Sequence, residues 1–366
     1  PVMMSTHNKD ILYFAGHKVY RSMNKGDDWT EISGDLTESD KRGDVPFATA
    51  TSLSESPLKF GLLWVGTDDG MVWVTDDGGN KWKKVSKNLP KGKWVSRVLA
   101  SPHKERRAWL ALNNYRNDDI QPYLYKTENL GENWKKMSKG LPKETINVVK
   151  EDPSNENIVY VGTDKGIYVS TNQGKDWQML GDQLPTVPVH DLIVHPRENE
   201  LVLGTHGRSV FVADVKPLQN LTDEIQSAEL HVMPLDEIKE KGSWDQREFP
   251  WGFTNNLADQ TPVYIWSKGE GEAELQIQNK DGSVYLSQQV NLSKGINQWS
   301  WDYKVDEAMA IAAEQAMNQK AANEANEVAV KEAEAESEMV TEDKPLNKSK
   351  TPYAESKRLD HPGYIE

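Results

Sequence analysis

The stretch that decides the fold is Thr75-Asp-Asp-Gly-Gly-Asn-Lys-Trp82, because its pattern returns three more times along the 366-residue chain. The other copies are Ser22-Met-Asn-Lys-Gly-Asp-Asp-Trp29, Thr127-Glu-Asn-Leu-Gly-Glu-Asn-Trp134 and Ser170-Thr-Asn-Gln-Gly-Lys-Asp-Trp177. All four read Ser/Thr-x-Asp/Asn-x-Gly-x-x-Trp, and we call this motif the box. Successive box tryptophans stand 53, 52 and 43 positions apart. Periods of this size indicate a structural unit repeated along the chain.

Each recurring position of the box has a physical role that we expect to be structural. The Asp or Asn accepts hydrogen bonds from nearby backbone amides, and the Gly supplies a positive φ for the turn. The Trp then anchors the following strand between neighbouring sheets, so we predict equivalent buried positions for the four tryptophans. The structural box residues are Asn24, Gly26, Trp29, Asp77, Gly79, Trp82, Asn129, Gly131, Trp134, Asn172, Gly174 and Trp177.

Short β-rich runs separated by Gly, Asp and Pro-containing turns surround each box. In the second unit we expect strands at Ala48–Leu53, Leu62–Gly66, Met71–Thr75 and Trp82–Ser86. The fourth unit repeats this layout, and a fifth has three strands within 189–215 but no box. Four-stranded units of this kind are typical of the blades of a β-propeller. The sequence therefore predicts an all-β chain with propeller blades over 1–215, forming part of a larger propeller.

The boxes resemble the Asp-box (BNR) repeat of β-propellers. Further stretches, above all Leu184-Pro-Thr-Val-Pro-Val-His-Asp191 and Gly204-Thr-His-Gly-Arg-Ser209, are similar to secreted bacterial proteins with sortilin-like propellers, often labelled glycosyl hydrolases. The resemblance implies an exported bacterial protein of the periplasm, cell surface or extracellular space. It also implies further blades N-terminal to this segment, so that the chain would be the C-terminal part of a longer protein.

After the propeller, the chain changes character. Residues 216–260 are expected to be a connector, and strands are predicted at Pro262–Ser267, Ala273–Gln278, Val284–Val290 and Gln298–Tyr303. These strands resemble an Ig-like β-sandwich, which we assign to 261–366 and expect to be truncated. Residues 306–358 are interpreted as an insertion in that sandwich. Its acidic, Ala-rich first part, 306–342, favours a solvated helix, and a flexible stretch follows.

Composition excludes several classes of protein. The 57 Asp and Glu outnumber the 43 Lys and Arg, giving a net charge of −14. This balance argues against nucleic-acid binding, which needs basic patches to replace phosphate counterions. No apolar run approaches the ~18 residues of a membrane-spanning helix. The absence of Cys excludes disulfides, thiol catalysis and Cys-based zinc sites.

The candidate ligand-binding residues are expected on one rim of the propeller. In an antiparallel blade, the loop between strands two and three lies on the face opposite the box. The first strand of each blade also begins on that face. A rim that concentrates charged and imidazole groups is a reasonable binding surface. The predicted rim residues are Arg116, Asp118, Asp119, His190, His206 and Arg208, with His17, Asp68, Asp69 and Asp164 on the same side.

No catalytic or metal-binding set stands out. Glycoside hydrolysis usually takes two facing carboxylates, and 57 acidic residues offer many pairs without singling one out. The arginine triad and Arg-Ile-Pro motif expected of a sialidase are absent, and so are the common nucleophile, zincin and phosphate-loop motifs. His190, His195 and His206 are not expected to bind metal, because His195 falls at the opposite end of its strand. We predict no cofactor.

Three functional classes remain open at the level of sequence. The favoured one is a non-catalytic exported scaffold whose propeller binds a protein, peptide or glycan, as a member of an envelope or surface complex. The alternative is a glycoside hydrolase of the Asp-box propeller type whose catalytic carboxylates lie partly in N-terminal blades outside this chain. The third is a structural or adhesion module, suggested by the Ig-like region.

Overall fold

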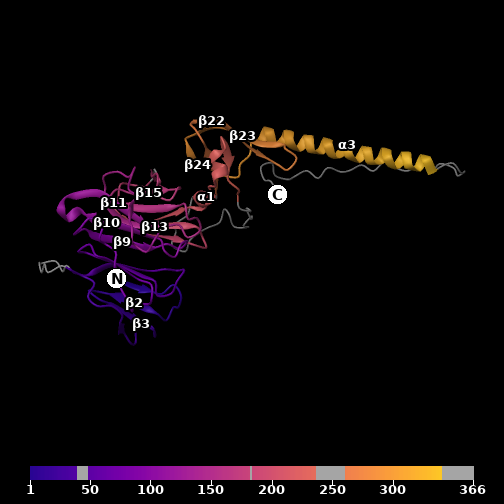
Figure 1. The fold of residues 1–366 in the computed structure, drawn as a ribbon. Helices are drawn as coiled ribbons and strands as arrows, with labels where there is room; N and C mark the ends of the chain where they lie inside the picture. Colours follow the sequence, from indigo (N-terminus) through magenta and orange to yellow (C-terminus); the bar gives the residue numbers. More distant parts are fainter. Residues whose placement is uncertain (39–47, 182–183, 236–259, 340–366) are drawn as a thin grey trace, which may run out of the picture. The chain divides into compact units, whose positions relative to one another are not determined.

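The computed structural model describes residues 1–38, 48–181, 184–235 and 260–339. The chain divides into two compact units, Pro1–Asn220 and Leu221–Glu366, which are described separately below (Figure 1). The first unit contains almost all of the buried aromatic and aliphatic side chains, and the second contains a smaller core beside a long helix.

The first unit is a series of small antiparallel sheets, each formed by consecutive strands. The first sheet comprises β1 (Val2–Met4), β2 (Leu12–Ala15), β3 (Val19–Ser22) and β4 (Thr30–Glu31). The second comprises β5 (Ala50–Glu55), β6 (Leu63–Thr67), β7 (Val72–Thr75) and β8 (Lys83–Lys84). The third comprises β9 (Trp94–Ala100), β10 (Ala108–Asn114), β11 (Asp119–Thr127) and β12 (Lys135–Lys136), with the 3-10 turn η1 (Tyr115–Asn117) between β10 and β11.

The fourth sheet comprises β13 (Ile146–Glu151), β14 (Val159–Thr163), β15 (Ile167–Ser170) and β16 (Gln178–Met179). A three-stranded sheet follows, with β17 (Val189–His195), β18 (Glu200–Thr205) and β19 (Val210–Asp214). The helical turn α1 (Lys216–Gln219) ends the unit. The mostly-β class predicted from the repeats is confirmed, and the sheets follow the predicted order of four four-stranded units and one of three strands.

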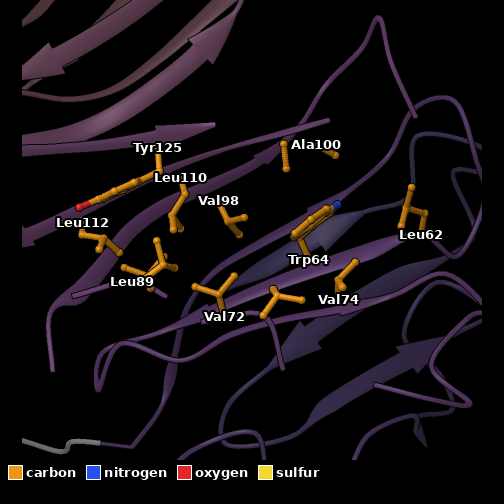
Figure 2. Packing of buried hydrophobic residues seen from close by; sticks show 13 residues of the cluster. Leu62, Trp64, Val72, Val74, Leu89, Val98, Ala100, Leu110, Leu112 and Tyr125 are labelled. Atoms are coloured by element: carbon orange, nitrogen blue, oxygen red, sulfur yellow. The ribbon is translucent and has the colours of Figure 1, made fainter. Parts of the chain in front are cut away.

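The sheets pack face to face in chain order. The first strand of each sheet contacts the first strand of the next, so that β5, β9, β13 and β17 form the inner row. Apolar clusters fill the space between sheets. Between the second and third, Trp64, Leu62 and Val72 pack against Val98 and Leu110 (Figure 2). Because the second, third and fourth sheets each lie between two neighbours, strands such as β6 and β14 are buried along their whole length.

All four boxes form the same hydrogen-bond network. The Ser or Thr hydroxyl donates to the box Asn or Asp and accepts from the amide of the box Gly, at 2.8–3.1 Å. Oδ1 of the Asn or Asp accepts from the amide four residues later, at 2.9–3.0 Å. The box Gly residues have φ between 77° and 101°. The box is therefore a turn that links the third and fourth strands of its sheet.

The box tryptophans are less buried than the sequence predicts, and their main polar contact lies between sheets. Indole Nε1 of Trp82 donates to the carbonyl of Ile32, Trp134 to that of Val85, and Trp177 to that of Met137, at 2.8–2.9 Å. Each acceptor stands three residues after the box Trp of the preceding sheet. These three indoles are partly buried, whereas Trp29 is 42% exposed. The prediction of four equivalent buried tryptophans is thus wrong for Trp29.

One hydrogen bond between sheets recurs two sheets later. His7 Nε2 contacts the Ser56 carbonyl at 2.9 Å, and His103 Nε2 contacts the Asp152 carbonyl at 2.6 Å, with each member 96 positions after its counterpart. The contact between the second and third sheets is different, because Ser54 Oγ there accepts from the amide of Ala100. The first and third sheets thus each direct a histidine at the following sheet, and the second and fourth sheets provide the carbonyl that it contacts.

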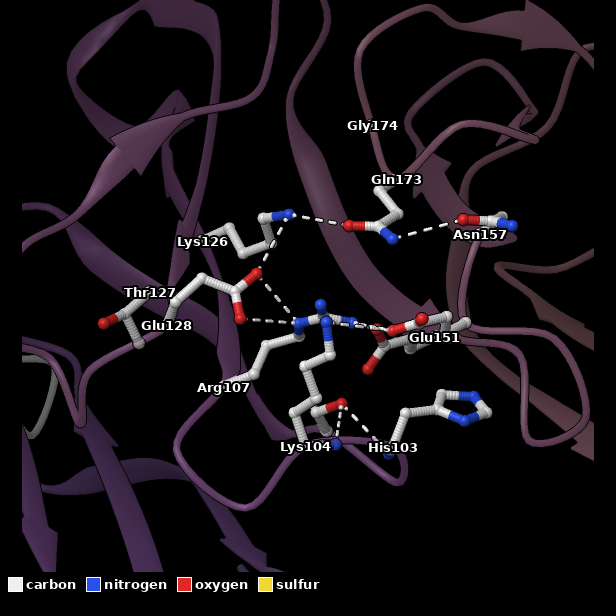
Figure 3. Close-up of polar contacts among 12 residues, drawn as sticks. His103, Lys104, Arg107, Lys126, Thr127, Glu128, Glu151, Asn157, Gln173 and Gly174 are labelled. Atoms are coloured by element: carbon white, nitrogen blue, oxygen red, sulfur yellow. Dashed lines mark hydrogen bonds and ion pairs between the residues drawn. The ribbon is translucent and has the colours of Figure 1, made fainter.

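A buried ion-pair network lies where the third sheet meets the fourth (Figure 3). Arg107 is 1% exposed, and its guanidinium contacts Glu151 at 2.8 Å, Glu128 at 2.9 Å and Glu156 at 3.2 Å. Glu151 is equally buried, and its second oxygen has no hydrogen-bond partner among the described residues. Lys126 Nζ also contacts the Glu128 carboxylate, at 3.2 Å.

The second unit holds a small sheet, a hairpin and a helix. The sheet has the order β20 (Leu230–Val232), β21 (Thr261–Ser267) and β24 (Gly295–Trp301), and the hairpin joins β22 (Gly271–Gln278) to β23 (Val284–Leu292). The core between them includes Val263, Ile265 and Leu292. The segment expected as a connector, 216–260, contributes α1, α2 (Asp223–Ser227) and β20, and its residues 236–259 lie outside the described residues.

The helix expected from the acidic, Ala-rich stretch is α3 (Glu307–Met339). Its first turns lie against β23: Ala313 is buried, and Met317 contacts Tyr285. From 318 to 332 every side chain is exposed. The solvated helix predicted for 306–342 is therefore present over most of that range, and the stretch 343–358 lies outside the described residues. None of the described helices is both long enough and apolar enough to cross a membrane.

Candidate functional site

Four residues, 115–118, connect the second and third strands of the third sheet, as many as in the second sheet and in the three-stranded sheet. Strand β10 ends at Asn114, η1 follows, and Asp118 adopts a left-handed conformation with φ 55° before β11 begins. Asn and Asp tolerate this conformation better than other non-glycine residues. The tight reversal places Tyr115 and Arg116 at the outer end of the loop and returns Asp119 toward β9.

Asp119 is the centre of a hydrogen-bonded cluster. Its Oδ2 accepts from Lys93 Nζ at 2.6 Å, from Tyr123 Oη at 2.8 Å and from Asn114 Nδ2 at 3.0 Å. The hydrogen bond from Lys93, followed by that from Asn114, holds the pKa of the Asp119 carboxyl well below its ordinary value. The Lys93 ammonium also lies over the Tyr123 ring, 4.5 Å from its centroid. This carboxylate is therefore ionised and fully engaged within its own sheet.

Arg116 lies in a different environment. Its guanidinium carbon lies 4.2 Å from the Trp94 ring centroid and 5.8 Å from that of Tyr115, and Nε donates to Tyr115 Oη at 3.3 Å. Among the described residues no carboxylate lies within ion-pair distance of Arg116. Tyr115 is half exposed, and Ile120 beside it is similarly exposed. The loop thus presents an arginine oriented by two aromatic rings, with its remaining N–H groups directed to solvent.

A second group of predicted residues gathers at the three-stranded sheet. His190, at the start of β17, and His206, in the β18–β19 loop, lie with ring centroids 5.3 Å apart. The neighbouring Asp191 Oδ1 accepts from Arg97 of β9 at 2.8 Å, across the inner row of strands. Burial, together with the nearby Arg97, lowers the pKa of Lys150 on β13. Arg208 follows in the same loop as His206 and makes no hydrogen bond or ion pair with another described residue.

The six predicted rim residues therefore fall into two groups. Arg116, Asp118 and Asp119 lie in one loop of the third sheet, and His190, His206 and Arg208 lie at the end of the three-stranded sheet. No hydrogen bond or ion pair within the described ranges joins one group to the other. Sequence reasoning missed Lys93, Trp94 and Tyr123, which complete the first group. Lys93 and Trp94 lie at the start of β9, a position that the strand pattern could have indicated, whereas Tyr123 lies within β11.

The other acidic residues of this side have structural roles. Asp68 Oδ1 accepts from the amides of Ala48 and Thr49 at 3.0 Å, and burial raises the pKa of its carboxyl. Asp164 accepts from Asn147 Nδ2 at 2.9 Å. Within the part of the chain that the structure describes, no three His, Asp or Glu side chains are arranged to hold a metal ion.

Comparison with known proteins locates a family signature within the sheet series. The family model described as Sortilin, neurotensin receptor 3 (Sortilin-Vps10) matches residues 17–144. No curated protein is similar enough in sequence to count as a match. Residues 17–144 run from the first sheet through the third and include the Arg116 loop.

Solved structures with similar strand arrangements include three GH74 enzymes. An ancestral GH74 enzyme aligns at 16% identity with a TM-score of 0.47, covering 79% of this chain and 38% of that one. The GH74 xyloglucanase from Xanthomonas campestris aligns at 12% identity with a TM-score of 0.46, covering 81% of this chain and 44% of that one. The GH74 enzyme from Niastella koreensis aligns at 14% identity with a TM-score of 0.47, covering 82% of this chain and 45% of that one. The chain spans less than half the length of these enzymes. The chain is thus similar to the sortilin-like family over residues 17–144, which lie within its series of consecutive antiparallel sheets.

Proposed function

We propose that this chain is the ligand-binding part of a non-catalytic, exported propeller scaffold, and that it captures an acidic group of a protein or peptide partner at Arg116. The observation that carries the proposal is the contrast between two neighbouring charges. Asp119 is saturated by Lys93, Asn114 and Tyr123, whereas Arg116 has aromatic support and no acidic partner among the described residues.

The geometry at Arg116 favours an anionic partner. A guanidinium is planar, so contact with an aromatic ring fixes the direction of its outer N–H groups, and two parallel N–H groups match a carboxylate. Trp94 and Tyr115 hold the side chain before a ligand arrives, which reduces the conformational entropy lost on binding. The half-exposed Tyr115 and Ile120 add an apolar margin suited to a protein surface.

The carboxylates near this loop support binding rather than hydrolysis. A glycosidase needs a general acid whose pKa is raised so that it holds a proton at neutral pH. The pKa of Asp119 is lowered instead, and Asp191 is engaged by Arg97. Asp68, whose pKa burial raises, has one oxygen committed to two backbone amides. A scaffold role therefore accounts for the described residues with fewer assumptions.

The proposal is tested by titrating the chain with a fluorescein-labelled decaglutamate peptide and following fluorescence anisotropy. Arg116→Ala should weaken binding by about tenfold, the value of one charge-assisted contact, while the melting temperature stays unchanged. The matched control is Arg106→Ala, an exposed arginine of the same sheet on the box side. If both variants lose the same affinity for the peptide, the loss comes from the change in net charge and not from a site at Arg116. Cleavage of a xyloglucan oligosaccharide by the chain would favour a hydrolase.

A further inference from the structure

The inner row of strands carries a lysine that makes no hydrogen bond or ion pair with another described residue. Lys150 lies on β13, and its neighbour Val149 packs in the apolar cluster formed with the third sheet. Because successive side chains of a strand point to opposite faces, Lys150 faces the three-stranded sheet. It pairs across the ladder with Tyr160 of β14, whose side chain is buried. Lys150 is thus enclosed between two sheets and only partly exposed.

An ion pair crosses β13 beside this lysine. Arg97 of β9 donates to Asp191 of β17 at 2.8 Å, and β13 contacts both of those strands. Arg97 and Asp191 are the two charged groups that act on the Lys150 ammonium. The Asp191 side chain is 70% exposed, so water screens its charge. The Nε–H of Arg97 is buried and has no acceptor among the described residues.

These surroundings favour the neutral amine of Lys150. Burial first, and the Arg97 guanidinium second, lower the pKa of Lys150, and Asp191 opposes them only in part. A neutral amine is a nucleophile, and desolvation or a neighbouring cation is a usual way in which proteins activate a lysine. The same guanidinium is suited to stabilise an anion formed on the lysine nitrogen, because one of its N–H groups lacks an acceptor.

Lys126 provides an internal comparison. Burial lowers the pKa of its ammonium as well. Its Nζ, however, contacts the Glu128 carboxylate at 3.2 Å and donates to Gln173 Oε1 at 3.3 Å. That carboxylate stabilises the ammonium form and would repel a negative charge built on the same nitrogen. Lys150 differs in having a cation beside its amine and no contacting carboxylate among the described residues.

We propose that Lys150 is a carbamate-forming site that reacts reversibly with dissolved carbon dioxide. The neutral amine attacks the carbon of CO2, an N–C bond forms, and one C–O π electron pair moves onto oxygen. The nitrogen then releases a proton to water, so the products are a negatively charged lysine carbamate and H+. Repulsion between Lys150 and Arg97 becomes attraction, and the carbamate oxygens are acceptors for the guanidinium. The reaction does not depend on the ligand binding proposed for Arg116.

The test traps the carbamate where it forms. The folded chain is equilibrated with CO2 and bicarbonate at mildly alkaline pH and treated with triethyloxonium tetrafluoroborate, which ethylates carbamates irreversibly. Peptide mass spectrometry should find the ethyl carbamate at Lys150, with an occupancy that rises with CO2 and disappears when the sample is degassed before trapping. Lys150→Gln should remove the modified peptide. Lys126→Arg, the matched control that keeps a cation beside Glu128, should leave the modification at Lys150 unchanged.

Two further substitutions distinguish this site from an ordinary amine. Arg97→Gln should reduce the occupancy at a fixed, subsaturating CO2 concentration by about tenfold, the effect of losing one hydrogen bond to a charged group. Asp191→Asn should raise the occupancy, because it frees the Arg97 guanidinium from its acidic partner. The melting temperature measured without CO2 shows that each variant is folded before it is compared.

Three results would overturn the proposal. One is a folded chain without ethyl carbamate at Lys150 at CO2 concentrations that modify a dipeptide added to the same sample. Another is equal occupancy at Lys126 and Lys150, because burial alone would then account for the reaction. The third is an occupancy at Lys150 that neither Arg97→Gln nor Asp191→Asn changes, since the amine would then react without any contribution from the ion pair.

Discussion

At the scale of the residue, Asp119 and Asp118 differ sharply although they are adjacent. Asp119 accepts three side-chain hydrogen bonds, whereas Asp118 ends η1 in a left-handed conformation, and its side chain makes no hydrogen bond to the cluster among the described residues. The composition of the loop indicated a charged site, but it could not say which acid was engaged. That assignment depends on Lys93 and Tyr123, which reach Asp119 only after β9 and β11 pair with β10.

Asp119→Asn should show a pH-dependent loss of stability. The folded pKa of Asp119 lies below the unfolded value of about 3.9, so its carboxylate stabilises the fold above that value. The contribution is lost as the pH falls below about 4 toward the folded pKa. Urea unfolding at pH 7, 5 and 3 should therefore give a difference from wild type that is similar at the two higher values and smaller at pH 3. Asp118→Asn, the control, should show little difference at any of them.

Arg107→Met should be among the most destabilising substitutions in the first unit. It leaves Glu151 buried without its cation, and breaking a buried pair in this way typically costs about 3–5 kcal/mol. Denaturant unfolding measures the loss. Adding Glu151→Met should recover a large part of it, because a buried apolar pair replaces the uncompensated charge. Arg106→Met at the adjacent exposed position should change stability by less than about 0.5 kcal/mol. Comparable effects at 106 and 107 would contradict this account.

At the scale of the element, the box was largely predictable and its inter-sheet role was not. The hydroxyl, the Asn or Asp and the Gly act within eight consecutive residues, so local turn chemistry anticipates their hydrogen bonds. The Trp acceptor is some 40–50 positions earlier in the chain, in the preceding sheet. A repeat pattern shows that sheets follow one another, but not which carbonyl lies opposite an indole.

Gly131→Ala should therefore cost more than Gly26→Ala. Both glycines have positive φ, so an alanine at either position carries similar backbone strain. At 131 the new methyl group also meets Val85 at 2.7 Å, whereas at 26 the nearest atom is 3.6 Å away. Overpacking of this kind typically costs about 1–3 kcal/mol. Equilibrium unfolding of the two variants isolates that extra cost, and equal losses would show that the contact between Gly131 and Val85 adjusts without strain.

At the scale of the whole molecule, the sequence predicted a sheet series followed by a change of architecture near residue 216. The box period identified the series, and the Ala and Glu content identified α3. Pairing in the second unit was harder to anticipate, because β20 lies about thirty positions ahead of its partner β21 and no repeated motif marks it. The grouping of rim residues also depended on sheet order, which brings Arg97 to Asp191 across 94 positions.

Ile265→Ala should unfold the second unit without affecting the first. The residue is 4% exposed in a core that includes Val263 and Leu292, and such truncations typically cost about 2–5 kcal/mol. Hydrogen exchange followed by mass spectrometry should show faster exchange in β20–β24 and unchanged protection in β9–β15. Leu110→Ala, in the larger core of the first unit, should produce the reverse pattern. A uniform loss of protection in either variant would mean that the two units unfold cooperatively.

The histidine–carbonyl contacts of the first and third sheets have a consequence for how such a chain can be shortened by recombination. Deleting the second sheet alone would take away the Ser56 carbonyl that His7 contacts, whereas deleting the second and third sheets together would bring the equivalent Asp152 carbonyl of the fourth sheet opposite His7. Such a two-sheet deletion spans about 96 codons, and we expect the shortened chain to keep this contact where the loss of one sheet does not.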